Sequence, residues 1–196
     1  QYNCSDWDFI LARADANAMV IINEDSKLTI ADPVVSGSAV LDLNFGIDVL
    51  GFAADMDAQN QLDAVAFQSW DSEQMSLVKG TGTEPSVNAH GDVTGVTLAA
   101  AGNSPSIALS SSAPEDSSLL ISWAKSHLQR SRLSKIRGFV SFIGNSSPLV
   151  GKLLNLSGFS PHFNGDAYLT KVIHTLEDGF WKTEAGFGMQ PKTFTD

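Results

Sequence analysis

The sequence predicts a mainly β protein with some α structure, an α+β fold in which one long amphipathic helix packs against an antiparallel β-barrel or a strongly curled sheet. Three observations predict this class. After Ala39, apolar and polar residues alternate with a period of two over several runs. Glycines separate the alternating runs in the last third of the chain. One long segment, 115–133, shows helical spacing instead.

Residues 1–38 are predicted to form a small helix and a β-hairpin. Ser5 followed by Asp8 resembles a capping box, and apolar residues at helical spacing predict a short helix from Ser5 to about Asp15. Two β-rich runs flank residues 23–26, which predicts a hairpin that ends at Pro33. This segment is too small to hold a core alone, so we assign it to a neighbouring α/β domain.

Residues 39–190 are predicted to form the barrel domain. The runs "AVLDLNFGIDVLGFAADMD" and "QLDAVAFQSWD" alternate on either side of a turn at residues 57–60. Residues 79–116 are rich in Gly, Ser, Thr, Asn and Pro, which predicts a long connection with one short strand in "GVTLAAAG".

The long helix and the last strands complete this domain. The helix begins in an acidic first turn after Pro114, and cations gather in its last turn, where they suit the helix dipole. The runs "IRGFVSFIG", "LVGKLLNLSG" and "YLTKVIHTLEDGFWKTEAGFGM" then predict strands, the last one a hairpin that turns at Asp178 and Gly179. Residues 191–196 are expected to lead toward a missing C-terminal part.

The charge of the chain is acidic and unevenly spread. Twenty-two acidic and 12 basic residues give a net charge of −10, which weighs against nucleic acid or an anionic membrane as the main partner. Residues 28–78 carry eight carboxylates and no Lys or Arg, whereas residues 117–165 carry six cations and no carboxylate. These stretches are either two solvated faces or complementary contacts within or between subunits. If the contacts join subunits, high salt should weaken assembly.

Composition sets further bounds. A chain of 196 residues with 43% hydrophobic residues can bury a real core. Cys4 is the single cysteine and cannot form an intrachain disulfide. No run of about 18 apolar residues occurs, which predicts that the chain does not span a membrane. Gln1 leads almost directly into a helix cap, so we expect a fragment of a longer protein.

The sequence offers little catalytic chemistry. None of His90, His127, His162 and His174 has a second His or Cys at a metal-ligand spacing, so no metal is predicted. His127 lies on the apolar face of the predicted helix, where a core or interface histidine is expected. Neither a nucleophile elbow nor a phosphate-binding loop is present, so we predict no catalytic residue and no cofactor.

Two carboxylate pairs were weighed for glycosidic acid/base chemistry. The pairs are Asp55 with Asp57 and Asp71 with Glu73, and each pair would share one face of a strand. An acidic surface row explains both pairs without any reaction. The case for an enzyme is therefore thin.

A family resemblance rests on short motifs and their order. The second half has a helix that ends in "RSRL", an Arg137–Gly138 strand, a "PLVG" turn, an "FNG" turn, a strand with His174 and a hairpin with "WKT". The first half has "SDWDFILARADANAM", "VAFQSWDSEQ" and "NAHGDVTGVTLA". This order closely resembles the VgrG spike proteins of type VI secretion, also called Rhs element Vgr proteins, and the phage late control protein D hubs. The resemblance covers nearly all of the chain and leaves the exact contractile injection machine open.

The resemblance implies a structural part and not an enzyme. Such proteins have a β-barrel of phage tail-hub type and form a homotrimer that caps the tail tube and joins it to the baseplate and to a membrane-puncturing spike. The implied partners are other copies of the chain, an Hcp-like tail tube protein, baseplate proteins and, through the missing C-terminal part, the spike tip and effectors. The residues 1–196 do not include the family's first barrel or its needle-like domain, so we expect this fragment to lack the puncturing part. The resemblance also implies assembly in the bacterial cytoplasm, without a signal peptide, followed by secretion or delivery with the machine.

Candidate interface residues follow from the same pattern. They are residues expected to contact another subunit or the tube: Arg130, Arg132, Arg137, His174 and Trp181. A period of two places Tyr168, Thr170, Val172, His174 and Leu176 on one side of a strand and Leu169, Lys171, Ile173 and Thr175 on the other. We therefore expect His174 to form a hydrogen bond to a neighbouring strand and to take no part in a reaction.

Two rival functions stay open at this point. One is a cell-wall-degrading, lysozyme-like enzyme of such a machine, which would lose lytic activity when one specific carboxylate is changed. The other is a monomeric ligand-binding β-barrel, which would need a lined cavity.

Overall fold

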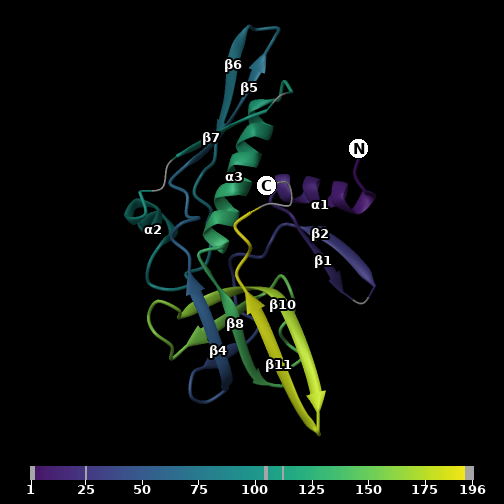
Figure 1. The fold of residues 1–196 in the computed structure, drawn as a ribbon, viewed down its shortest axis with the longest axis vertical. Helices are drawn as coiled ribbons and strands as arrows, with labels where there is room; N and C mark the ends of the chain where they lie inside the picture. The colour runs from purple at the N-terminus through teal and green to yellow at the C-terminus, as the bar shows by residue number, and fades with distance from the viewer. Residues whose placement is uncertain (1–2, 25, 104–105, 112, 193–196) are drawn as a thin grey trace.

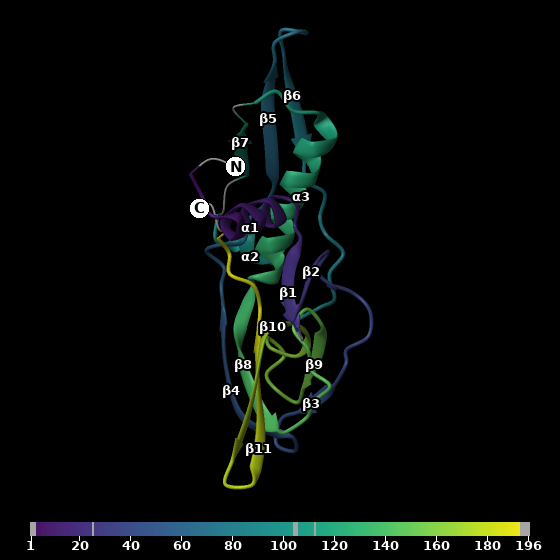
Figure 2. The same cartoon turned by 90° about the vertical axis from the view of Figure 1, so that its right-hand side faces the viewer.

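The structure is a computed structural model that describes residues 3–24, 26–103, 106–111 and 113–192. The molecule is elongated (Figure 1). One end carries a three-stranded sheet with the long helix α3, and the other end carries a six-stranded sheet. A small helix and hairpin lie beside the middle of the molecule (Figure 2). The predicted exit segment 191–196 lies mostly outside the described residues, and the predicted domain boundary after residue 38 stays a prediction.

The N-terminal prediction is confirmed as local structure. Helix α1, Asp6–Ala16, begins after Ser5, whose hydroxyl accepts a 3.1 Å hydrogen bond from the backbone N–H of Asp8. Strands β1, Val20–Glu24, and β2, Lys27–Ala31, pair antiparallel as a two-stranded sheet. An isolated two-stranded hairpin is only marginally stable, so this segment depends on contacts with the rest of the chain.

The three-stranded sheet and α3 form one packed unit, the helix–sheet layer. Strand β5, Val65–Asp71, lies between β6, Ser76–Thr81, which is antiparallel, and β7, Ile107–Ser110, which is parallel. Helix α3, Ser117–Leu133, covers one face, and Val65 packs there with Ala124 and Leu128. Among the described residues, no helix combines the length and apolar character needed to cross a membrane.

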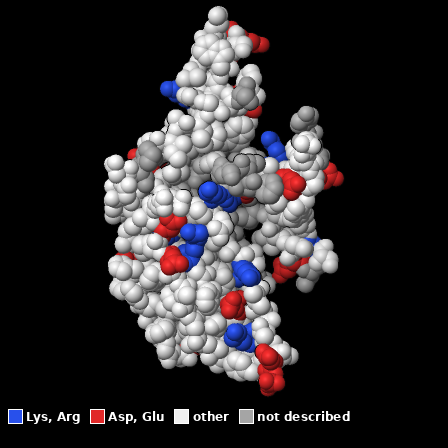
Figure 3. Space-filling model, in the orientation of Figure 1, with Lys and Arg blue, Asp and Glu red and all other residues white. Residues whose placement is uncertain are grey.

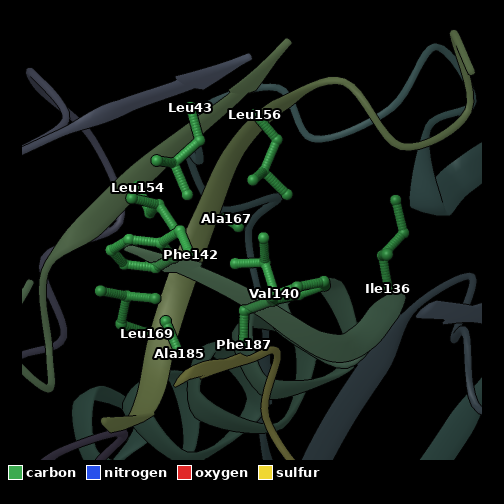
Figure 4. Packing of buried hydrophobic residues seen from close by; sticks show 10 residues of the cluster. All are labelled: Leu43, Ile136, Val140, Phe142, Leu154, Leu156, Ala167, Leu169, Ala185 and Phe187. Atoms are coloured by element: carbon green, nitrogen blue, oxygen red, sulfur yellow. The ribbon is translucent and has the colours of Figure 1, made fainter. Parts of the chain in front are cut away.

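The six-stranded sheet curls into a half-barrel. Its hydrogen-bonded order is β3-β9-β10-β11-β8-β4. The strands are β3, Asp42–Asn44; β4, Val49–Met56; β8, Ile136–Ile143; β9, Leu153–Ser157; β10, Gly165–Glu177; and β11, Phe180–Phe187. Ten buried side chains fill its inner side (Figure 4), including Phe142, Leu154 and Leu169. Burial of this apolar surface is the main stabilising term for this half of the molecule.

Of the two predicted forms, this sheet agrees with the strongly curled sheet, and the antiparallel barrel is not confirmed. Its hydrogen-bonded order ends at β3 on one side and β4 on the other, so it is a half-barrel. The β3–β9 pair is also parallel. The chain reaches β3 along the edge of β9, where Val40 donates to the carbonyl of Leu153 and Asn155 donates to that of Leu41. A period of two gives no sign of which strands meet or in which direction.

The long connection 79–116 contains more structure than the sequence predicts. The segment predicted as a strand is helix α2, Gly95–Ala101, capped by the Thr94 hydroxyl, which accepts from the N–H of Thr97 at 3.1 Å. Leucine and three alanines favour a helix there, and this preference outweighs the short apolar pattern. The long helix itself begins at Ser117, with Asp116 at its N-cap.

A β-bulge in β10 changes the predicted sides of that strand. The pairing with β11 shifts between Leu169 and Lys171, so Thr170 is an extra residue. Leu169 therefore lies on the same inner side as Val172 and His174, and it is buried in the core. The predicted placement of Leu169 beside Lys171 is wrong, because a one-residue bulge reverses the parity of every position before it.

We predict that Gly80→Ala destabilises the helix–sheet layer by about 1–3 kcal/mol. A Cβ at Gly80 would lie 2.6 Å from the carbonyl carbon and 2.7 Å from the Cβ of Leu120, so the helix would have to move away from β6. Denaturant unfolding measures the change. Thr81→Ala, at an exposed position of the same strand, is the control. Equal stabilities for the Gly80→Ala variant and the unchanged chain would contradict the close packing.

Candidate functional site

The polar side chains gather where the helix–sheet layer meets the half-barrel. This junction consists of the end of α3, the start of β8, the loop 57–62 and the extended connection 82–94, which we call the strap. The three arginines predicted as interface residues all lie here or next to it, and each one has a partner within the chain.

Arg132 is the most buried of these arginines. Its side chain keeps only 3% of its surface exposed, whereas that of Glu84 on the strap is 50% exposed. Nε and one terminal nitrogen of Arg132 bind the two carboxylate oxygens of Glu84 at 2.6 and 2.9 Å, and the other terminal nitrogen donates to the carbonyl of Leu62 at 2.9 Å. A two-pronged pair of this kind fixes direction as well as distance.

The loop 57–62 is fixed to the same helix end. Gln61 is fully buried and its side-chain amide donates to the carbonyl of Ser131 at 2.6 Å. The Ser131 hydroxyl accepts from the N–H of Leu62 and donates to the carbonyl of Asn60, both at 3.0 Å. Sequence reasoning missed Gln61, Ser131 and Glu84, because partners about 50 to 70 positions apart leave no local pattern.

Arg130 joins α3 to the N-terminal segment. It forms an ion pair with Asp15 at the end of α1, and the Ser126 hydroxyl donates to the carbonyl of Asp15 at 2.9 Å. Both contacts cross between helices that are more than 100 positions apart in the sequence. They supply part of the support that the small N-terminal segment needs.

Arg137 forms an ion pair with a carboxylate from the acidic stretch. Its guanidinium lies 3.0 Å from Asp57, which also accepts two hydrogen bonds from Asn60. Partial burial raises the pKa of Asp57, but the bonds from Asn60 and the charge of Arg137 outweigh it, so the pKa is lowered. One pair between the predicted acidic and basic stretches therefore lies within the chain.

One member of each candidate carboxylate pair is engaged in local structure. Asp57 binds Asn60 and Arg137, as described above. Asp71 accepts hydrogen bonds from the N–H groups of Glu73 and Gln74, which is a turn contact. Among the described residues, no three His, Cys, Asp or Glu side chains gather as a metal ion would require.

A cavity of about 270 Å³ lies beneath the strap. Its wall includes His90, Arg132, Lys135 and Asp166. Lys135 donates to the carbonyl of Val93 on the strap at 2.6 Å, and its burial lowers its pKa. Burial also lowers the pKa of His90 to about 4, with a further contribution from the charge of Lys135.

His174 and Trp181 lie away from the junction, on the β10–β11 hairpin. Nδ1 of His174 lies 3.0 Å from the hydroxyl of Thr183, its cross-strand partner, so the expected hydrogen bond to a neighbouring strand is confirmed. Thr183 is fully buried and accepts from the N–H of Asn145 at 3.1 Å. Thr183 therefore connects the hairpin to the loop after β8, and His174 contacts this connection through its bond to Thr183.

The hairpin tip exposes large apolar side chains on both of its sides. Leu176, which is 76% exposed, and Trp181 lie on one side, and the exposed Phe180 lies beside Glu177 on the other. On the outer side, acidic and basic side chains alternate over the β10–β11 hairpin (Figure 3). Single exposed apolar residues are common, but a projecting hairpin with several of them is typical of a contact surface.

Comparison with known proteins places this geometry in a family. A family model described as the Alg8 N-terminal domain matches residues 1–178. The chain belongs to the Alg8 N-terminal domain family. No curated protein sequence matches the chain.

Solved structures of phage tail proteins share the fold of this Alg8 N-terminal domain. A tail protein from Neisseria meningitidis MC58 aligns over 100% of the chain with a TM-score of 0.65 and 14% identity. The 43 kDa tail protein of prophage MuSo2 from Shewanella oneidensis aligns over 97% with a TM-score of 0.63 and 9% identity. Prophage tail protein gp18 from Listeria monocytogenes aligns over 98% with a TM-score of 0.52 and 12% identity. The chain spans 58%, 54% and 55% of these proteins, respectively.

We predict that Arg132→Met lowers the free energy of unfolding by about 2–4 kcal/mol. The carbonyl of Leu62 and the carboxylate of Glu84 would each lose their hydrogen bonds from the buried guanidinium. Glu84→Gln should cost less, about 1 kcal/mol, because that side chain stays half in water. Chemical denaturation measures both. Lys125→Met, an exposed cation of the same helix, is the control. Equal losses for Arg132→Met and Lys125→Met would contradict a central role for Arg132.

We predict that His174→Ala lowers stability or assembly by about 0.5–1.5 kcal/mol, the usual contribution of one hydrogen bond. Thermal unfolding and native mass spectrometry measure the two effects. Thr175→Ala, one residue along β10 and on its other side, is the control. A folded, assembled His174→Ala protein that had lost an enzymatic activity would reverse this interpretation.

Proposed function

We propose that the chain is a structural part of a contractile injection machine, a VgrG-like hub that assembles as a trimer between a tail tube and a membrane-puncturing spike. The observation that carries the proposal is that the half-barrel leaves one side of the second part of β10, and the outer side of the terminal strand β4, without a strand partner among the described residues. The fold shared with phage tail proteins supports a role in a tail, and the motif order given above supports the hub.

One uncovered edge belongs to β10. β9 pairs only with residues 165–168 of this strand, and β11 occupies the other side of the remainder. Residues 171–177 therefore present one row of backbone groups without a strand partner among the described residues. A long, regular edge of this kind is a template for pairing with another chain.

The second uncovered edge is β4, which pairs only with β8 among the described strands. Successive antiparallel pairs from β4 to β10 make these two strands antiparallel to each other. In a ring of copies, β10 of one copy would therefore meet β4 of the next in the antiparallel sense. Two different edges that meet in this way form a head-to-tail interface. Such an interface closes into a ring when the rotation from one copy to the next is a full turn divided by a whole number.

Charge complementarity supports this pairing. Lys171 on β10 lies in the same cross-strand row as Ala53 on β4, and Asp55 is the next residue of β4 on that side. Without a shift in register, Lys171 of one copy would lie diagonally opposite Asp55 of its neighbour. Opposite charges at such positions stabilise sheet pairing modestly and select the register.

The remaining features of the proposal follow from the same arrangement. The ten core side chains fill the inner side of the half-barrel, which fits a structural part better than a ligand-binding barrel. We propose no enzymatic activity and no cofactor. The proposed partners are an Hcp-like tube protein, baseplate proteins, and the spike tip and effectors through a further part of the protein, with assembly in the bacterial cytoplasm before delivery.

The five candidate interface residues divide into two groups under this proposal. Arg130, Arg132 and Arg137 stabilise the fold, since their charges are engaged within the chain. His174 and Trp181 lie on the projecting hairpin, where a neighbouring subunit or the tube would meet them. The proposal therefore relies on His174 and Trp181 for contacts with partners.

We predict a trimer in native mass spectrometry of the protein. Lys171→Glu should decrease the trimer because it places two acids near each other across the edge, and Asp55→Lys in the same chain should restore it. Lys152→Glu, which changes the same charge on an exposed position outside the two edges, should leave the trimer unchanged. A monomer at high concentration would contradict the hub. An unchanged trimer fraction in Lys171→Glu would contradict the pairing of β10 with β4.

A further inference from the structure

The strap, residues 82–94, adds to the half-barrel as a short extra strand. The N–H of Asp166 donates to the carbonyl of Ala89 at 2.9 Å, and the N–H of Gly91 donates to that of Asn164 at 2.6 Å. His90 and Gly165 form an antiparallel bridge between these bonds. The strap thus occupies the side of β10 that β11 leaves free before Leu169.

Several residues fix the position of the strap on β10, and we call this position its seat. A Cβ at Gly165 would collide with the carbonyl oxygen of Ala89, and the φ of +115° at Gly165 disfavours any other residue. The side-chain amide of Asn88 also donates to Asp166 at 2.6 Å and to the carbonyl of Gly37 at 2.7 Å. These contacts of Gly165 and Asn88 therefore hold the strap in one position, and His90 lies between Asn88 and the Gly91 N–H bond to Asn164.

The imidazole of His90 is enclosed by the seat. Its ring lies edge-on to Phe187, with centroids 5.5 Å apart, and it makes a hydrogen bond to the backbone of Phe163. The residue keeps some exposed area, but Nε2 is buried and has no hydrogen-bond partner among the described residues. A neutral imidazole tolerates this position, whereas a protonated one would bury an unpaired N–H donor.

The charges around His90 oppose its protonation. From the junction of α3 and β8, the Lys135 cation faces the ring and disfavours a second positive charge. From β10, Asp166 has the opposite effect, but its two oxygens already accept from Asn88 and Asn155. The other ionisable side chains on the cavity wall are Glu84, Arg132 and Tyr168.

We infer that protonation of His90 releases the middle of the strap from β10, so that acid opens the cavity beneath it while both sheets stay folded. The ends of the strap have separate anchors: Glu84 binds Arg132 at one end, and at the other end Lys135 binds the carbonyl of Val93. Opening is therefore confined to the residues between these anchors. This inference goes beyond the proposed hub role and does not depend on it.

The direction and size of the effect follow from proton linkage. The pKa of His90 falls from an ordinary value of 6.5 to about 4 in the seated strap, so the seated state binds fewer protons than the open one. The seated state is fully favoured at pH values above the ordinary pKa of 6.5, and this preference is lost as the pH falls toward the pKa of about 4 in the seated strap. The opening constant should rise roughly 20-fold from pH 7 to pH 5 and on the order of 100-fold by pH 4.

Hydrogen–deuterium exchange, corrected for the intrinsic pH dependence of amide exchange, tests the inference on the intact chain. Between pH 7 and pH 5, the amides of residues 89–92 and of Asp166 should lose protection. The amides of α3, β8 and β11 should keep theirs. Unchanged protection of residues 89–92, or simultaneous loss over the whole chain, would overturn the inference.

Two matched variants assign the effect to one residue. His90→Gln removes the titrating group and should abolish the pH dependence of strap protection. His162→Gln removes an exposed histidine, which binds Asp92 near the end of the strap, and should leave the dependence in place. Retained dependence in His90→Gln, or its loss in His162→Gln alone, would contradict the assignment.

An NMR titration of the unmodified protein guards against a His90→Gln variant that does not fold. The His90 imidazole should titrate well below its ordinary pKa of 6.5, and its midpoint should coincide with the loss of strap protection. A midpoint near 6.5 for His90, or protection that is lost without any titration of this ring, would overturn the inference.

Discussion

The burial of Arg132 constrains the arrangement of the whole junction. A guanidinium that is almost free of solvent has to be surrounded by acceptors, because an unpaired buried charge costs several kcal/mol, roughly 3–5 by comparison with other buried pairs. Its acceptors come from two distant segments, the loop 57–62 and the strap. Both segments must therefore reach the end of α3, and this requirement sets where the helix–sheet layer sits on the half-barrel.

Each half of the molecule has an apolar core, but the connection between them is largely polar. The larger core lies in the half-barrel, and the smaller one lies between α3 and β5. Ion pairs and hydrogen bonds have directional geometry, so they fix orientation where apolar packing alone would allow sliding. An elongated part that transmits axial force would benefit from such a junction, because its two ends could not rotate independently.

The sequence predicted the elements whose causes are local. Ser5 and the helical spacing after it were enough for α1, and the Asp178–Gly179 turn was enough for the β10–β11 hairpin. The long-range features were not predictable in the same way. The bulge at Thr170, the parallel pairing of β3 with β9 and the pairing of Glu84 with Arg132 all depend on residues brought together only by the fold.

Of the candidate site, only the hydrogen bond of His174 followed from the sequence, because it depends on the strand periodicity near a turn. The cavity and the enclosed His90 had no local signature. The glycine, serine and asparagine residues around His90 predict only that it lies in the long connection 79–116. The backbone of that loop satisfies its hydrogen bonds on β10, which shows that a loop composition does not exclude an ordered strap.

The ion pairs within the chain change the interpretation of the uneven charge distribution. The basic residues at the end of α3 and the start of β8 are predicted to contact a neighbouring subunit. However, Arg137 binds Asp57, and Arg130 and Arg132 bind acids outside the acidic stretch. These partly buried pairs are screened little by salt, whereas the exposed Lys171 and Asp55 of the sheet edges are screened strongly. Assembly through the edges should therefore weaken as salt is added, whereas the junction should make unfolding depend little on salt. Because different residues govern the two, the same titration separates the interactions that hold one copy together from those that join copies.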